Sequence, residues 1–175
     1  AELALRLNQD AQAIEETFGV QDATAIKKLH INAGDKHNGN KTVVIITFSD
    51  EQKIVYKPRP LGVDKHYQSY LAWYNSLGPD LPLKVMKLLD QQDYGYAEFI
   101  THETCTNEEE LDRYYARIGA ILCLLYIIKA TDFHHENIIA HGEQPVLIDL
   151  ESLFHSIAAK GYDPVDETTN RFIQN

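Results

Sequence analysis

The stretch "ATDFHHENIIAHGEQPVLIDLESLF", residues 130–154, concentrates side chains that can bind metal ions or transfer protons. It holds three histidines, two aspartates, three glutamates and one asparagine among short aliphatic runs. Ionisable groups beside buried strands are unfavourable unless their charge is compensated. The composition therefore leaves three interpretations open: a zinc site, a solvated loop or a phosphoryl-transfer site.

Asp132 and Asn137 in this stretch have the spacing D-x-x-x-x-N. Protein kinases use this interval in their catalytic loop, where the aspartate accepts the proton of the substrate hydroxyl and the asparagine binds a metal ion. Both residue types are also common in turns and helix caps, which is the ordinary interpretation of an isolated pair. The pair becomes informative only together with further residues.

Asp149 lies twelve residues after Asn137 and ends the apolar run 146–148. A metal-binding aspartate follows the kinase asparagine at a similar interval, although Leu150 and Glu151 stand here in place of the usual Phe-Gly. The alternative is a turn residue at a strand end. An unpaired carboxylate beside a buried strand is costly, however, and Mg²⁺ prefers oxygen ligands. We therefore predict that Asn137 and Asp149 bind Mg²⁺.

Upstream, Lys57 ends the strand pattern "IVYK", the setting of the kinase lysine that contacts nucleotide phosphates. An exposed strand lysine is the commoner alternative. The preceding polar turn "GDKHNGNKTV" contains Gly34 and Gly39, and glycine lets a backbone approach phosphate oxygens closely. The motif G-x-G-x-x-G is not present, so an ordinary hairpin turn remains possible. Asp35 and His37 are unusual in a phosphate-covering loop, because a carboxylate there repels phosphate unless it works with a metal or accepts a proton.

A zinc site is disfavoured by the spacing of the histidines. The arrangement H-E-x-x-H, which places two histidines on one helix face, is missing, and so are paired cysteine ligands. His135 and His141 are therefore predicted to be solvated or to pack against neighbouring side chains.

The elements that position these residues follow from periodicity and turn signals. We expect helices at 2–18, 64–78 and 107–129, and strands at 25–33, 42–48, 53–59, 137–142 and 145–151, with two further strands within 81–100 around a turn near 91–93. The order is strand-rich first, with one inserted helix, and helix-led second. It predicts an α+β protein with the two-lobed fold of protein and lipid kinases: an N-lobe over residues 1–100 and the start of a C-lobe over 101–175.

The helix predicted at 107–129 is the longest in the chain. Thr106 followed by Glu109 resembles a capping box at its start. Its apolar face is predicted to contain Ile118, Ile121, Leu122, Leu125 and Ile128. Tyr114, Tyr115 and Tyr126 are expected to pack in the core or between the lobes.

The signals follow one another in the order of a kinase: loop, strand lysine, helix, hinge-like "AEFI", long helix, D-x-x-x-x-N and strand-terminal aspartate. Their agreement with this order is more informative than any one of them. The segments "GDKHNGNKTVVIITFSDEQKIVYKPR", "YAEFI" and "TDFHHENIIAHGEQPVLIDLESLF" together resemble the dehydratase region of class II lanthipeptide synthetases. The resemblance runs from about Gly34 onward. It implies ATP-dependent phosphorylation of Ser and Thr in a precursor peptide, followed by elimination of phosphate to leave dehydroalanine or dehydrobutyrine.

The resemblance also implies roles for individual residues. The nucleotide would contact Lys57, Gly34, Gly39, Glu98 and Ile100. Asp132 would orient or deprotonate the substrate hydroxyl, with His134 supporting its loop, and Asn137, Asp149 and Glu151 would hold Mg²⁺. Asp35 and His37 would serve activity, including the elimination step. An arginine and a threonine of the family that assist elimination are expected beyond Asn175. Asp64, Gln68 or a residue outside the chain is expected to pair with Lys57, and the sequence leaves this choice open.

Composition limits the classes of partner. The 175 residues carry a net charge of -10, with a pI of about 5.2, which disfavours non-specific nucleic-acid binding. The two cysteines, Cys105 and Cys123, fit a reduced intracellular protein. No apolar run suggests a transmembrane segment and no signal peptide is recognisable. We expect a fragment of a bacterial cytoplasmic synthetase whose partners are the precursor peptide and the rest of the enzyme, including a cyclase domain. The alternatives are a kinase-like module that binds nucleotide or peptide without turnover and, less favoured, a zinc-dependent hydrolase.

Overall fold

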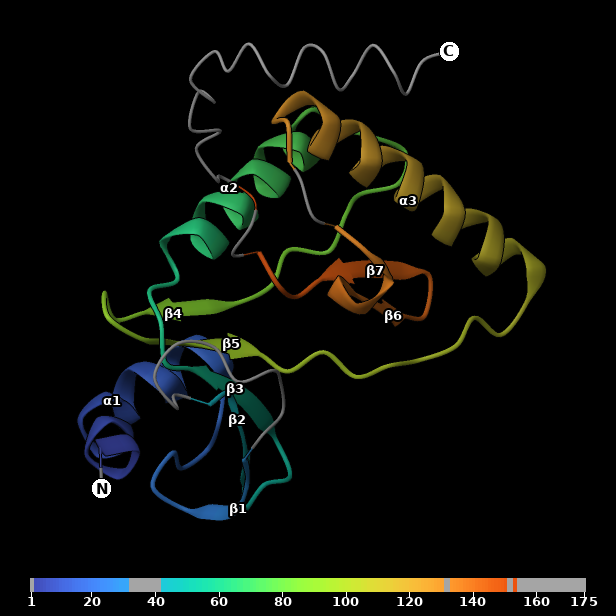
Figure 1. Cartoon of the computed structure of the whole chain (residues 1–175). Coiled ribbons are helices and arrows are strands. Elements are labelled where there is room, and N and C mark those ends of the chain that lie inside the picture. The colour runs from blue at the N-terminus through green and yellow to red at the C-terminus, as the bar shows by residue number, and fades with distance from the viewer. Residues whose placement is uncertain (1, 32–41, 131–132, 151–152, 154–175) are drawn as a thin grey trace, which may run out of the picture.

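The computed structural model describes residues 2–31, 42–130, 133–150 and residue 153. Within these ranges the chain forms three α-helices, seven β-strands and one short 3₁₀ helix, so the predicted α+β class is confirmed (Figure 1). In chain order the elements are α1 (Glu2–Phe18), β1 (Ile26–Ile31), β2 (Val44–Phe48), β3 (Lys53–Lys57), α2 (Gly62–Ser76), β4 (Leu88–Asp90), β5 (Gly95–Glu98), α3 (Glu108–Ile127), η1 (His135–Asn137), β6 (Ile138–His141) and β7 (Gln144–Leu147).

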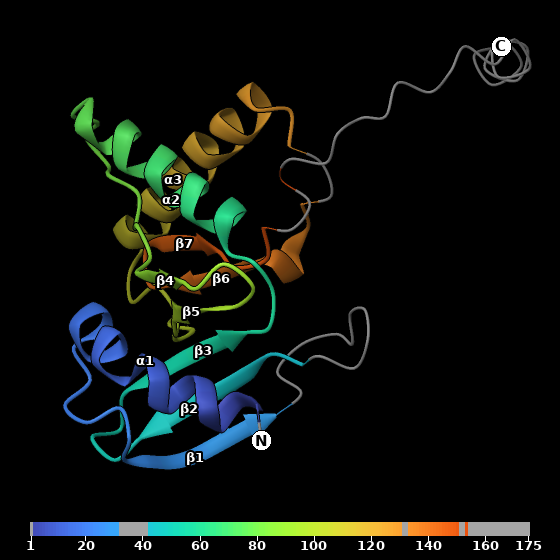
Figure 2. The same ribbon diagram turned by 90° about the vertical axis from the view of Figure 1, so that its left-hand side faces the viewer.

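The first five strands form one antiparallel sheet in the order β1-β2-β3-β5-β4, and α1 packs against it (Figure 2). Along β2 buried residues alternate with half-buried ones, as expected of a strand with one face on a core. The core shared with α1 contains Leu7, Ile14, Val20, Val44, Ile46, Phe48, Ile54, Tyr56, Tyr94 and Tyr96. Because Ile54 and Tyr56 belong to this core, Val55 and Lys57 lie on the opposite face of the sheet.

A buried carboxylate also attaches α1 to the sheet. Asp10 is 4% exposed and accepts hydrogen bonds from the hydroxyls of Tyr94 and Tyr96, at 2.8 and 2.9 Å, and from Gln91 Nε2 at 2.9 Å. Burial, together with the bond to Asp10, raises the pKa of Tyr94 to about 12. The hydroxyl therefore remains a donor at neutral pH, and the buried charge of Asp10 is stabilised by hydrogen bonds.

The second layer consists of α2, α3 and the antiparallel β6–β7 hairpin, which lie together on the β4–β5 side of the sheet (Figures 1 and 2). Their shared core contains Tyr67, Leu71, Leu83, Ile121, Leu124, Leu125, Leu147, Leu150 and Leu153. A smaller apolar cluster of Met86, Ile100 and Val146 connects the segments flanking β4 and β5 to the hairpin. The division into two lobes at residue 100 stays a prediction.

Several boundaries differ from those predicted. Residues 82–87 have no regular secondary structure, so the first of the two strands predicted within 81–100 is limited to β4. The strand predicted at 145–151 ends earlier, because β7 ends at Leu147. The hairpin turns at Gly142 and Glu143, with Gly142 at a φ of 57°, and β7 begins at Gln144, one residue before the predicted strand. Pro145 is tolerated there because it lies in a strand of a two-stranded sheet, where one side of each strand needs no ladder donor.

The start of α3 is capped one residue later than predicted. Asn107 is the N-cap, and its side chain accepts a hydrogen bond from Glu110 N at 2.9 Å. Glu110 in turn accepts one from Thr106 N at 2.7 Å. The predicted pair of Thr106 and Glu109 is therefore wrong, and the reciprocal bond from the glutamate reaches the residue before the N-cap instead of the N-cap itself.

The buried face of α3 is narrower than predicted. Ile121 and Leu125 are buried, but Leu122 is 59% exposed. Tyr114 is half-buried, whereas Tyr115 and Tyr126 are exposed, so the predicted packing of these two in the core or between the lobes is wrong within the described chain. The apolar residues cover more of the helix circumference than its single contact face can bury. Among the described residues, no helix combines the length and the apolar character that crossing a membrane requires.

Candidate functional site

Lys57 reaches from the sheet to the second layer. It is the last residue of β3, only 9% exposed, and lies on the sheet face opposite α1. Its Nζ donates to Asp64 Oδ1 at 3.0 Å and to the backbone carbonyl of Ile148 at 2.8 Å. The lysine ammonium is thereby held directly beside the backbone of the predicted metal ligand Asp149.

The sequence left open which residue pairs with Lys57, and in the structure this residue is Asp64. It lies in the first turn of α2, where the helix dipole favours a negative charge, and is fully buried. Arg59 also binds it, through Nη1 to Oδ2 at 2.7 Å and through Nη2 to Oδ1 at 3.4 Å. Gln68, the other candidate, instead accepts a hydrogen bond from Met86 N at 2.8 Å. A buried carboxylate shared by two cations avoids the penalty of an unpaired buried charge.

Asn137 and Asp149 lie at the two ends of the β6–β7 hairpin. Ile138 pairs with Leu147, and beyond this pair Ile148 N donates to the carbonyl of Asn137 at 3.0 Å. Asn137 Nδ2 lies 3.5 Å from the carbonyl oxygen of Asp149, which is a long hydrogen bond. The hairpin therefore brings the two predicted metal ligands together.

The surroundings of these two side chains differ. Asn137 is 8% exposed, and its Oδ1 is buried with no hydrogen-bond partner in the described chain. The Asp149 side chain is 49% exposed, with Arg59 Nη2 at 4.0 Å from its Oδ1. The expectation of an uncompensated carboxylate beside the buried strand is therefore wrong, since the chain leaves β7 before Asp149. The argument for a cation instead comes from the unpartnered amide oxygen, because such atoms are rare in proteins and oxygen donors suit Mg²⁺.

Three other predicted residues fall within the described chain. His134 has a half-exposed side chain, with Nδ1 3.6 Å from Glu136 Oε2 and its ring beside that of His135. The carboxylate of Glu98 accepts from Lys84 Nζ at 2.7 Å and from Lys87 N at 3.0 Å, which holds the segment before β4 against β5. Ile100 is buried in the small cluster that contacts the hairpin.

The remaining predicted residues, Gly34, Asp35, His37, Gly39, Asp132 and Glu151, lie outside the described residues. In the described parts of the chain, no group of three or more His, Cys, Asp or Glu side chains is arranged to hold a metal ion. Arg59 was not predicted from the sequence. Its position in "YKPR", two residues after the strand lysine, was the available signal.

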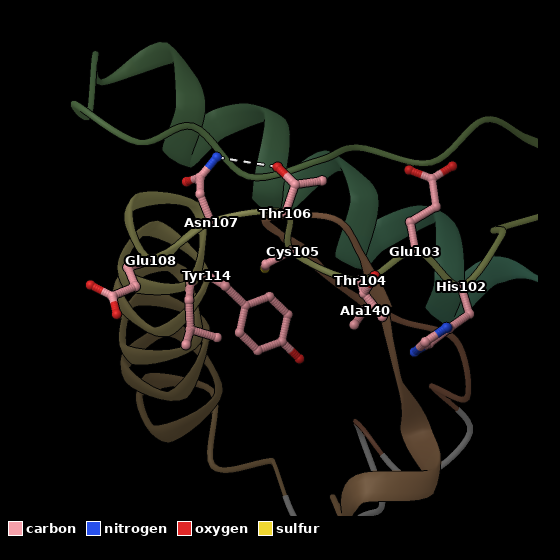
Figure 3. Close-up of a pocket in the computed structure, with 10 residues that line it drawn as sticks. His102, Glu103, Thr104, Cys105, Thr106, Asn107, Glu108, Tyr114 and Ala140 are labelled. Carbon is pink, nitrogen blue, oxygen red and sulfur yellow. Dashed lines mark hydrogen bonds between the residues drawn. The ribbon is translucent and has the colours of Figure 1, made fainter.

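A cavity of about 490 Å³ lies away from these residues, along residues 102–107 and the start of α3. Figure 3 shows the ring of Tyr114 within it and Cys105, Thr106 and Ala140 around it. Burial raises the pKa of Tyr114. Glu103 and Glu108 also line the cavity, and their negative charge disfavours a phosphate group there. The cluster around Lys57, which contains Lys57, Arg59, Asp64, Asn137 and Asp149, is the better candidate for phosphate chemistry.

Comparison with known proteins agrees with the sequence motifs. All of residues 1–175 match the family described as "Domain of unknown function (DUF4135)". The chain is also 31% identical over 155 residues to the "Lacticin 481/lactococcin biosynthesis protein LcnDR2" of Lactococcus lactis subsp. lactis. The match covers 84% of this chain and 16% of that relative, so the chain spans about a sixth of the relative's length. The resemblance to class II lanthipeptide synthetases is confirmed, and the chain belongs to the DUF4135 family associated with them.

Proposed function

We propose that this domain performs the dehydration step of lanthipeptide biosynthesis: it phosphorylates Ser and Thr of a ribosomal precursor peptide with ATP and Mg²⁺, and the phosphate is then eliminated. The observation that carries the proposal is the contact between Lys57 Nζ and the carbonyl of Ile148 at 2.8 Å. It joins a sheet lysine to the hairpin that carries Asn137 and Asp149. This contact supports the proposal that residues distant in sequence form one site, between layers that we propose correspond to the two lobes of a kinase-like fold.

Phosphoryl transfer depends mainly on positioning and electrostatics. In the proposed site, Lys57 donates hydrogen bonds to phosphate oxygens of the nucleotide, and Asp64 keeps its ammonium in place. Asn137 and Asp149, with Glu151, hold Mg²⁺, which neutralises charge on the phosphates when bound. The carboxylate of Asp149 is half-exposed and therefore accessible to a metal–nucleotide complex from solution.

Asp132 is the proposed acceptor of the Ser or Thr hydroxyl proton. Ala130 and Phe133, which precede and follow residues 131–132 in sequence, are half-buried and pack against the core of the second layer. Elimination then requires a base that takes the α proton of the phosphorylated residue. The electron pair of that bond forms the Cα–Cβ double bond, and phosphate departs with the electrons of the Cβ–O bond. Asp35 and His37 are the proposed residues for this half-reaction.

The proposal extends to partners and location. An ATP-dependent reaction on a ribosomal peptide would take place in the cytoplasm. Cyclisation of the dehydrated peptide would belong to a separate domain of the longer synthetase, since this chain corresponds to only 16% of the relative's length.

Mass spectrometry of precursor peptide incubated with the intact protein, ATP and Mg²⁺ tests the proposal. We expect gain of phosphate followed by net loss of water. Lys57→Met and Asp149→Asn should abolish both products, whereas Lys65→Met and Asp112→Asn, at exposed positions of α2 and α3, should preserve them. Nucleotide binding without any modified peptide would favour a binding module without turnover. Full turnover by Asp149→Asn would reject its role as a metal ligand.

A further inference from the structure

Arg59 occupies a central position in the cluster, between the two carboxylates. Its guanidinium is anchored by both oxygens of Asp64 and by the carbonyl of Pro60, to which Nη1 donates at 3.1 Å. Its side chain is only 22% exposed. A two-point contact with a fully buried carboxylate fixes the orientation of the guanidinium plane, because the fork of an arginine matches the two oxygens of a carboxylate.

The anchored guanidinium presents Nη2 to Asp149 at 4.0 Å from Oδ1. This distance is longer than a hydrogen bond, so the arginine attracts the carboxylate without taking a metal's place at that oxygen. The half-exposed side chain of Asp149 follows the last strand of the hairpin, and restricting its rotamer costs conformational entropy. A fixed positive charge on one side of it favours the rotamers that point toward the cluster.

We infer that Arg59 is a positioning residue that orients Asp149 for Mg²⁺ when the metal–nucleotide complex binds. The inference rests on the proposed function of the site. Arg59 acts through Asp149, while Asp64 holds Arg59 and Lys57 in a fixed relation to each other. The arginine therefore connects the phosphate-binding end of the site with its metal-binding end.

The identity of the residue matters as well as its charge. A lysine at position 59 has a single ammonium on a flexible stem, so it cannot hold both oxygens of Asp64 and also direct a second nitrogen to Asp149. Arg59→Lys should therefore retain the charge of the cluster but lose the orientation of Asp149. Arg59→Gln should lose both.

Calorimetric titration of the intact protein with a non-hydrolysable ATP analogue, with and without Mg²⁺, tests the inference. Partners that orient a metal ligand typically change metal affinity about 10- to 100-fold. We expect Arg59→Gln to weaken binding of the magnesium–analogue complex within this range. Binding of the analogue without Mg²⁺ should change much less, because it depends on Lys57. Arg59→Lys should show an intermediate loss.

The Asp149→Asn background provides the control. If Arg59 acts through Asp149, adding Arg59→Gln to Asp149→Asn should produce little further loss of the magnesium-dependent gain in affinity. The inference is overturned if Arg59→Gln lowers the magnesium-dependent gain in affinity equally in both backgrounds, or if neither Arg59 variant changes that gain. Either result leaves the proposed function intact. Loss of the fold in both variants, seen by circular dichroism, would make Arg59 a structural residue and also overturn it. Wild-type protein that binds no magnesium–nucleotide would instead contradict the proposed function.

Discussion

At the scale of single residues, Asp64 is the anion on which the cluster depends. It is fully buried, and both Lys57 and Arg59 are bound to it. Without this carboxylate, the buried ammonium of Lys57 and the half-buried guanidinium of Arg59 would be left beside each other where their repulsion is incompletely screened. The carboxylate thus stabilises the fold and also keeps Lys57 at the place where a phosphate chain is proposed to bind and Arg59 beside Asp149.

We expect Asp64→Asn to lower the free energy of unfolding by about 3–5 kcal/mol, because removing one partner of a buried ion pair leaves the other uncompensated. Urea denaturation followed by circular dichroism measures this change. Asp80→Asn, at an exposed position of the loop after α2, should change stability by no more than about 0.5 kcal/mol. Equal stability of the two variants would show that the cluster does not stabilise the fold.

Glu143, in the turn of the β6–β7 hairpin, provides a prediction about pH. A hydrogen bond from Arg113, assisted by the charge of Arg117, holds the pKa of its carboxyl below the ordinary value of 4.5. The unfolded chain therefore binds a proton at higher pH than the folded chain. Its contribution to stability is present above about pH 4.5 and is lost as pH falls through the folded pKa.

Denaturation midpoints measured between neutral pH and acid should accordingly decrease less steeply for Glu143→Gln than for wild type below about pH 4.5. The variant should already be the less stable of the two at neutral pH. Parallel curves over this range would show that the contacts with Arg113 and Arg117 do not affect titration of the carboxyl.

At the scale of elements, the junction between β3 and α2 determines where Asp64 lies. Leu61 precedes α2 and is fully buried beside Gly95, the residue of β5 that pairs with Lys57. A Cβ at Gly95 would lie 2.5 Å from Leu61 Cδ1 and 2.6 Å from the carbonyl oxygen of Leu89. The absence of a side chain at this position lets the chain pack closely and brings the first turn of α2 to the lysine.

Gly95→Ala should therefore destabilise the protein by about 1–3 kcal/mol, the usual effect of overpacking, because one of the contacts involves backbone that cannot move away. Gly119→Ala in α3 is the matched control. A Cβ there meets nothing within 4 Å, so the substitution should stabilise the helix by about 0.5–1 kcal/mol. Denaturation curves of the two variants should shift in opposite directions, and a shift of both in the same direction would contradict the packing argument.

Local patterns predicted the elements well and their contacts less well. Apolar periodicity located the three helices, and turn residues located the hairpins, because both depend on neighbours in sequence. The pairing of Lys57 with Asp64 depends on the path of the chain through the strand–helix junction, which no periodicity encodes. The exposed Leu122 and Tyr126 were predicted incorrectly because apolar residues reveal a helix but do not reveal which part of its surface has a neighbour.

At the scale of the whole molecule, the cluster around Lys57 lies where the two layers meet. The sheet provides Lys57, the junction to α2 provides Arg59, the first turn of α2 provides Asp64, and Asn137 and Asp149 lie at the two ends of the hairpin. Away from the site, Arg117 on α3 joins the segment before β4 to the hairpin turn, because it donates to the carbonyls of Pro82 and Glu143. A ligand that contacts Lys57 and Asp149 together would therefore stabilise the relative position of both layers.

This arrangement predicts that a magnesium–nucleotide complex stabilises the entire domain instead of one loop. A ligand at a free concentration 100 times its Kd adds about 2.7 kcal/mol to the free energy of unfolding if it binds only the folded state. Thermal unfolding of the intact protein should shift upward with a non-hydrolysable ATP analogue and Mg²⁺, and the sheet and hairpin should gain hydrogen-exchange protection together. Lys57→Met should lose the shift, while Lys65→Met on the exposed side of α2 should retain it. Protection confined to the sheet would mean that the ligand does not contact the hairpin, and that Lys57 and Asp149 do not share one site.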